Sequence, residues 1–69
     1  MTAASRDPVP GEVYFEFRQV GQSMRVVAVD AHTGIEVTIV GPVATPQSQL
    51  ERLALRKLTM RLEAVSKRS

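Results

Sequence analysis

The stretch "DAHTG", residues 30–34, holds the residue types that could do chemistry in this chain. Asp30, His32 and Thr33 bring a carboxylate, the only histidine of the sequence and a hydroxyl together, directly ahead of Gly34. Such a set supports acid–base catalysis only if the groups are held within hydrogen-bond reach in a site that excludes water. A connection between two strands is wet and offers no oxyanion donors. We therefore interpret the stretch as a turn and predict that the protein is not an enzyme.

The remaining carboxylates that could suggest a metal site or acid–base work are Glu12, Glu16 and Glu36. All three fall on the polar side of alternating segments, where such residues are usually solvated. The chain contains no cysteine and a single histidine, which removes thiolate zinc sites and leaves few other ligands. It also contains no glycine-rich phosphate-binding pattern. The sequence predicts neither a cofactor nor a metal.

Three segments with alternating apolar and polar residues position these groups, over about residues 12–20, 23–30 and 35–41. Gly21-Gln22 between the first two suits a two-residue type II′ hairpin, because glycine accepts a positive φ at no steric cost. A four-residue loop, residues 31–34, connects the next pair if Asp30 pairs with Ile35. A three-residue loop would turn Ile39 away from the apolar face, so burial favours the four-residue loop. We expect Asp30 to accept backbone hydrogen bonds in this loop and Gly34 to close it in a left-handed conformation.

A helix is predicted from about residue 46 to residue 66, with Thr45 as its N-cap and Pro46 at its first position. The fold class is therefore α+β: a three-stranded antiparallel meander followed by one long C-terminal helix, or βββα. Residues 12–69 form the single domain, and residues 1–11, which are rich in proline and small polar residues, form a flexible tail. The expected core consists of Phe15, Phe17, Val26, Ile39, Leu50, Leu58 and Leu62.

The predicted helix has more apolar surface than one three-stranded sheet can cover. Its apolar residues span well over half of the circumference, whereas a helix on a sheet needs a stripe of about 100° or somewhat more. The second face of the sheet also carries apolar residues among its charges. At 69 residues and without disulfides, the chain is small enough that oligomerisation is the expected source of extra stability.

We therefore predict a homodimer that serves as a self-associating interaction or scaffolding module, with a further protein partner left open. Helix pairing, helix exchange onto the partner's sheet and edge-strand pairing are three open routes to it. The predicted interface consists of Leu53, Leu55, Met60, Leu62, Tyr14, Val27, Val29 and Val40.

The charge of the chain is uneven, although its net value is only +2. Residues 1–44 are mildly acidic, whereas residues 45–69 are basic. An alternative function is therefore a nucleic-acid-binding dimer whose helices present Arg52, Arg56 and Lys67 to phosphates. The competing interpretation is a solvated cationic face in which the last basic residues complement the helix dipole.

The segments "GEVYFEF", "VDAHTGIEVTIVGP" and "LERLALRKLTMRLE" together resemble a family of short bacterial proteins classed as a domain of unknown function. The resemblance covers about residues 11–64. It implies a small stand-alone cytosolic protein and assigns no catalytic or binding residue. The absence of an apolar signal-peptide core and of a long apolar run adds to the expectation of a cytoplasmic protein outside the membrane.

Overall fold

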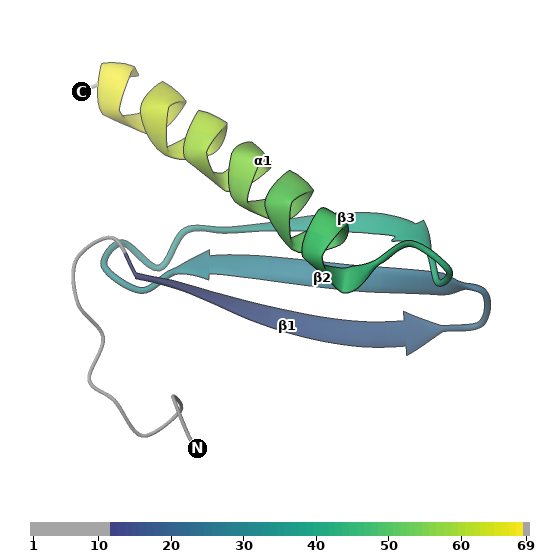
Figure 1. The fold of residues 1–69 in the computed structure, drawn as a ribbon. Helices are drawn as coiled ribbons and strands as arrows, with labels where there is room; N and C mark the ends of the chain where they lie inside the picture. The colour runs from purple at the N-terminus through teal and green to yellow at the C-terminus, as the bar shows by residue number, and fades with distance from the viewer. Residues whose placement is uncertain (1–11, 69) are drawn as a thin grey trace.

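The structure, a computed structural model, describes the backbone of residues 12–68 and the side chains of residues 12–66. Strands β1 (Val13–Val20), β2 (Ser23–Asp30) and β3 (Glu36–Pro42) precede helix α1 (Gln47–Arg68). The strands form one antiparallel sheet in the order β1-β2-β3, and α1 lies across one face of it (Figure 1). The predicted βββα fold is confirmed. The predicted tail, residues 1–11, lies outside the described residues.

The first hairpin has the predicted two-residue turn. Gly21 has a φ of 59°, whereas no non-glycine residue of the described chain has a positive φ, so Gln22 does not. A positive φ at the first central residue alone is the signature of a type II′ turn. The turn fixes the register, which pairs Phe17 with Val26 and Phe15 with Ala28.

The second register follows the four-residue loop. Ala28 pairs with Val37, and the Asp30 amide donates a hydrogen bond of 2.9 Å to the carbonyl of Ile35. The Gly34 amide returns to the Asp30 carbonyl at 2.8 Å, with Gly34 at a φ of 79°. Val13, Phe15 and Phe17 of β1, Val26 and Ala28 of β2, and Val37 and Ile39 of β3 therefore share one face, the inner face, on which the helix packs.

The core differs from the predicted one because α1 packs against β2 and β3 and leaves β1 largely aside. The buried apolar residues of the described chain are Val26, Ala28, Val37, Leu50, Ala54 and Leu58. Phe15, Phe17, Ile39 and Leu62, which were expected in the core, are only half-buried and pack against its margin. The two small residues, Ala28 and Ala54, lie at the centre, where they let the helix approach the sheet closely.

Two local contacts fix the start and the position of the helix. The carbonyl of Pro46 accepts the amide of Leu50 at 3.2 Å, so Pro46 takes the cap position that was predicted for Thr45, and the helix begins one residue later. Gly41, on the inner face of β3, lies directly beneath Leu50: a Cβ atom at Gly41 would be 2.8 Å from Leu50 Cδ2. The absence of a side chain at Gly41 therefore lets α1 dock where it does.

The C-terminal half of α1 extends past its own sheet. Leu58 is the last fully buried residue of the helix up to residue 66, and Leu62 is half-buried, whereas Met60 and Val65 are exposed. Figure 1 shows the helix rising away from the strands toward its C-terminal end. About ten residues, or roughly 15 Å of helix at 1.5 Å per residue, lie beyond Leu58.

Candidate interaction surface

The DAHTG stretch is a hydrogen-bonded turn. One carboxylate oxygen of Asp30, Oδ2, accepts both the Thr33 amide at 2.9 Å and the Thr33 hydroxyl at 2.7 Å. The Ile35 amide donates to Thr33 Oγ1 at 3.2 Å. Asp30 and Thr33 are thus occupied in closing the loop, while His32 is exposed to solvent. The Asp30 carboxylate therefore caps the turn by accepting the amide of the residue three positions later.

The electrostatics of Asp30 follow from these contacts. The hydroxyl and the amide of Thr33 both stabilise the ionised form and lower the pKa of the Asp30 carboxyl below its usual value. The neighbouring His32 and its amide act in the same direction, and partial burial opposes them. Little of the Asp30 side chain is accessible to solvent, 4%, although the turn itself lies at the surface. The lowered pKa is a property of the turn and stabilises the folded state.

The three glutamates do not assemble a site. Glu16 and Glu36 are exposed on the outer face of the sheet, which is the face that α1 does not cover, and Glu12 lies just before β1. Among the described residues no three His, Cys, Asp or Glu side chains come close enough to hold a metal ion together. The side chains that remain as candidates for a functional surface are therefore mainly the exposed apolar ones.

The apolar residues predicted on the helix are divided between its two flanks. Leu53 (48% exposed), Leu55 (41%) and Met60 (60%) are exposed. Leu55 borders Phe15 on the β1 side. Leu53 and Met60 lie four and three residues from Lys57, which reaches β3, so they share the β3 side of the helix. Leu62 is half-buried against the core and belongs only in part to the exposed surface.

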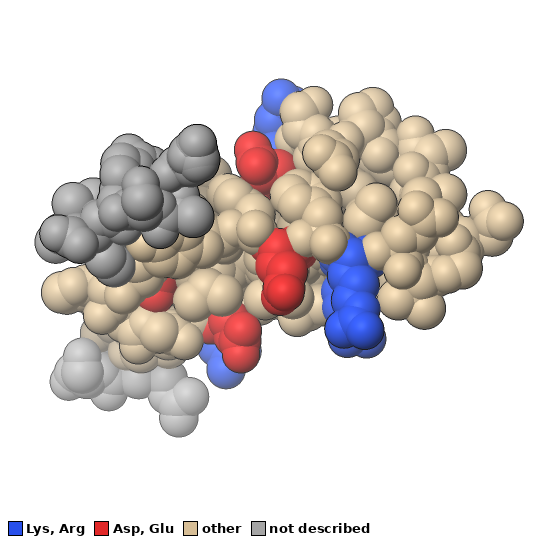
Figure 2. Space-filling view, turned by 90° about the horizontal axis from the view of Figure 1, so that it is seen from below, with Lys and Arg blue, Asp and Glu red and all other residues tan. Residues whose placement is uncertain are grey.

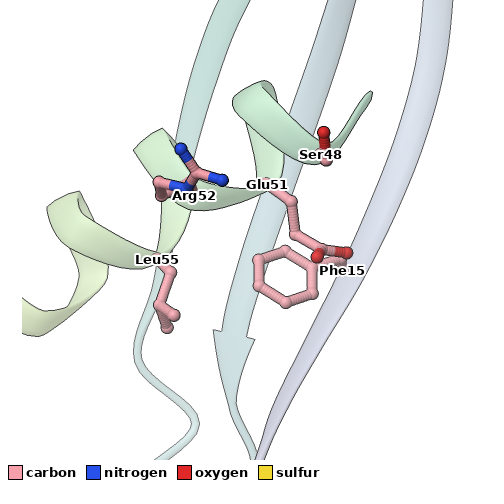
Figure 3. A pocket seen from close by; sticks show the side chains of 5 residues that line it. All are labelled: Phe15, Ser48, Glu51, Arg52 and Leu55. Atoms are coloured by element: carbon pink, nitrogen blue, oxygen red, sulfur yellow. The ribbon is translucent and has the colours of Figure 1, made fainter. Parts of the chain in front are cut away.

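A groove lies in the described surface between β1 and α1. It is lined by Phe15, Ser48, Glu51, Arg52 and Leu55. Figure 3 shows Glu51 reaching over the ring of Phe15, with Leu55 on the same side of the helix and the Arg52 guanidinium pointing away. Its volume is about 280 Å³. Small-molecule sites usually enclose about 300–1,000 Å³, so this open groove suits a protein surface better than a small ligand.

The outer face of the sheet carries the other four predicted interface residues. Tyr14 and Val40 are exposed, and Val27 and Val29 are half-buried between their neighbours. Glu16, Arg18, Arg25 and Glu36 stand among them. Figure 2 views this face from below and shows acidic and basic side chains scattered over a larger area of other residues. Sequence reasoning did not place Val20 (59% exposed) or Val65 (43%) in the interface, although their apolar type was a signal for both.

The basic residues of the helix form two groups. Arg52 and Arg56 are exposed one turn apart, with no ion pair to any side chain that the structure describes. Lys57 instead donates a hydrogen bond of 2.9 Å to the carbonyl of Thr38. The side chain of Lys67 lies outside the described residues. Of the three predicted phosphate contacts, the structure therefore brings Arg52 and Arg56 together and does not place Lys67.

A comparison with known families matches the part of the chain that forms the sheet and most of the helix. Residues 10–65 match DUF6898, a domain of unknown function. The chain belongs to this family. The DUF6898 match spans all three strands and most of α1, and it bears out the resemblance to a domain of unknown function. No curated protein and no solved structure matches the chain. In the described part of this DUF6898 protein, no helix is both long and apolar enough to cross a membrane.

Proposed function

We propose that this DUF6898 protein is a small non-enzymatic domain that self-associates and acts as an interaction or scaffolding module. The observation that carries the proposal is the incomplete cover of the inner face. Because α1 packs on β2 and β3, Phe15 is left half-buried beside the exposed Leu55. Apolar surface of this kind usually marks an interface. A bacterial and cytoplasmic setting remains a prediction from the sequence.

The energetics support association if most of this surface becomes buried. Covering about 600 Å² of apolar surface per chain contributes on the order of 15 kcal/mol at roughly 25 cal/mol per Å². Lost translation and rotation cost about 4–15 kcal/mol. A contact through one exposed leucine would not offset that cost, so the interface must include the groove and the residues around it.

Sedimentation velocity of two matched variants tests the proposal. Leu55→Glu puts a charge into the groove, whereas Leu53→Glu puts the same charge on the opposite flank of the same helix. Both sites are exposed, so both variants should keep the helical circular dichroism of the parent chain. We expect Leu55→Glu to shift the protein to monomer. Leu53, which the sequence predicted in the interface, lies outside the interface proposed here, so Leu53→Glu should leave the protein associated. If the parent chain and both variants sediment as monomers at every concentration, the proposal is wrong.

Nucleic-acid binding is a second candidate, which the exposed Arg52 and Arg56 support, since neither forms an ion pair with another described side chain. Fluorescence anisotropy with a labelled duplex RNA or DNA tests it at 50 and 200 mM salt. Binding through phosphates should weaken steeply between these salt concentrations, and Arg52→Gln combined with Arg56→Gln should abolish it. An apolar self-interface would change little with salt.

A further inference from the structure

We propose that two copies of this chain pair through the free edges of their β1 strands, antiparallel and centred on Phe15, into one six-stranded sheet with both helices on the same face. The inference rests on the proposed self-association and specifies its partner, its edge and its register. It is carried by the difference between the two edges of the sheet, by the half-covered inner face of β1 and by the charge pattern of its outer face.

The free edge of β3 is partly occupied. The Asp30 amide donates to Ile35, so residues 35, 37 and 39 of this segment turn their backbone groups toward β2. The backbone groups of Thr38 therefore point away from the sheet. Lys57 Nζ donates to the Thr38 carbonyl at 2.9 Å, which puts a charged side chain on this edge. A lysine at an edge is one of the devices by which proteins prevent strand addition.

The free edge of β1 has no such cover within residues 12–66. The Ala31 amide donates to the Glu12 carbonyl at 2.9 Å, so the even-numbered residues of this segment bond to β2. Val13, Phe15, Phe17 and Gln19 consequently turn their amides and carbonyls outward, and no described strand pairs with them. Three of the four carry apolar side chains that α1 leaves half-covered. The outward backbone groups and the half-covered apolar side chains are therefore found on the same strand.

The charges on the outer face restrict the register. Two copies related by a two-fold axis pair their β1 strands antiparallel. The residue numbers of two opposed residues then add to the same sum along the whole pair, and the residue at half that sum, on which the register is centred, opposes itself. Centring the pair on Glu16 opposes that glutamate to itself, and centring it on Tyr14 opposes Glu12 to Glu16. Centring it on Arg18 opposes that arginine to itself. Like charges directly opposite each other are destabilising, so these three registers are disfavoured.

Of the five registers centred on residues 14–18, two remain, which are centred on Phe15 or on Phe17. The first opposes Glu12 to Arg18 of the second copy, and the second opposes Glu16 to Arg18. Burial separates them: centring on Phe15 pairs that residue with itself and Val13 with Phe17, so the inner-face pairs whose two members are both described are apolar. Centring on Phe17 places Phe15 opposite Gln19. The register about Phe15 is therefore the one that closes the half-open face, with the groove beside Leu55 at the junction of the two copies.

Disulfide trapping tests this register, since the chain has no cysteine of its own. In the proposed dimer residue 14 of one copy opposes residue 16 of the other in a non-hydrogen-bonded pair, where Cα atoms are about 4.5 Å apart. That separation suits a disulfide. Like positions are displaced by two residues along the strand, which puts their Cα atoms about 8 Å apart and out of reach. Tyr14 and Glu16 are both exposed, so each tolerates cysteine without loss of the core.

Tyr14→Cys and Glu16→Cys are mixed in denaturant, refolded together and oxidised, and the products are weighed by mass spectrometry. We expect the mixed disulfide to form at least about tenfold faster than either like disulfide, because only the mixed pair meets the geometry. Thr38→Cys, which lies on the β3 edge, is the matched control and should stay unlinked.

The outcomes separate the two proposals. A like disulfide of Glu16→Cys as the main product, or efficient linkage of Thr38→Cys, would overturn the proposed register or edge. If sedimentation shows a dimer but neither the mixed disulfide nor either like disulfide of Tyr14→Cys and Glu16→Cys forms, the β1 pairing is wrong and self-association still stands. A monomer at every concentration would overturn both.

Discussion

Gly41→Ala tests how closely α1 docks on the sheet. The added Cβ would lie 2.8 Å from Leu50 Cδ2, whereas carbon atoms in favourable contact are about 3.5–4.0 Å apart. Leu50 is 2% exposed, so its side chain would have to shift within the core. Overpacking of this kind costs about 1–3 kcal/mol. Alanine also lowers the conformational entropy of the unfolded chain. Where the backbone conformation permits alanine, this effect stabilises the folded state by about 0.4–1 kcal/mol and offsets part of the cost of overpacking.

The clash therefore outweighs the entropic gain, and we expect the free energy of unfolding to fall by about 1–2 kcal/mol. For a domain of this size that corresponds to a Tm lower by about 4–8 °C per kcal/mol. Urea unfolding followed by circular dichroism measures it, at one fixed protein concentration because association contributes to stability.

A double-mutant cycle with Leu50→Ala is the control for the Gly41→Ala experiment. Leu50→Ala alone leaves a cavity and should cost about 2–5 kcal/mol. The Cβ of Gly41→Ala would fill part of that cavity, so the two costs should fall short of additivity by about 0.5–3 kcal/mol. A Gly41→Ala protein as stable as the parent, or fully additive costs, would refute the close packing of Leu50 over Gly41.

Three further predictions concern the second loop and the β3 edge. Because the pKa of Asp30 is lowered in the folded state, its ionised form stabilises the fold above its usual pKa, and this contribution is lost as the pH falls through the lowered value. Asp30→Asn should therefore reduce the loss of Tm between about pH 5 and pH 2, and an unchanged acid profile would contradict the Thr33 contacts. Gly34→Val forces a branched residue to a φ of 79° and should cost at least about 1–2 kcal/mol, whereas His32→Ala should stay within about 0.5 kcal/mol in the same urea titration. Lys57→Ala removes the cover of the β3 edge, so sedimentation should show species larger than those of the parent chain, and an unchanged distribution would argue against that protective role.

The fold was predictable because its determinants are local. Alternation of apolar residues marked the strands, and Gly21 and Gly34 occupy the two positive-φ positions that set the registers. The role of Asp30 in its turn followed from the same local chemistry. Each of these features needs only a few neighbouring residues, so one sequence contains enough information to assign it.

The position of the helix on the sheet was not predictable in the same way. It depends on contacts between distant residues, such as Gly41 beneath Leu50 and Lys57 at the carbonyl of Thr38. Periodicity shows that a helix has an apolar face but not which strands that face covers. Phe15 and Phe17 were therefore expected in the core, whereas the shift of α1 toward β3 leaves them half-buried. The sequence showed that the helix and sheet have more apolar surface than they can cover. It did not show that this surface is concentrated beside β1.

The mass of the native chain in solution tests the central claim most directly. Sedimentation equilibrium at micromolar concentration needs no variant and no partner. We predict twice the 7.6 kDa chain mass, with dissociation to single chains only on dilution. A single 7.6 kDa species over the whole micromolar range would contradict self-association.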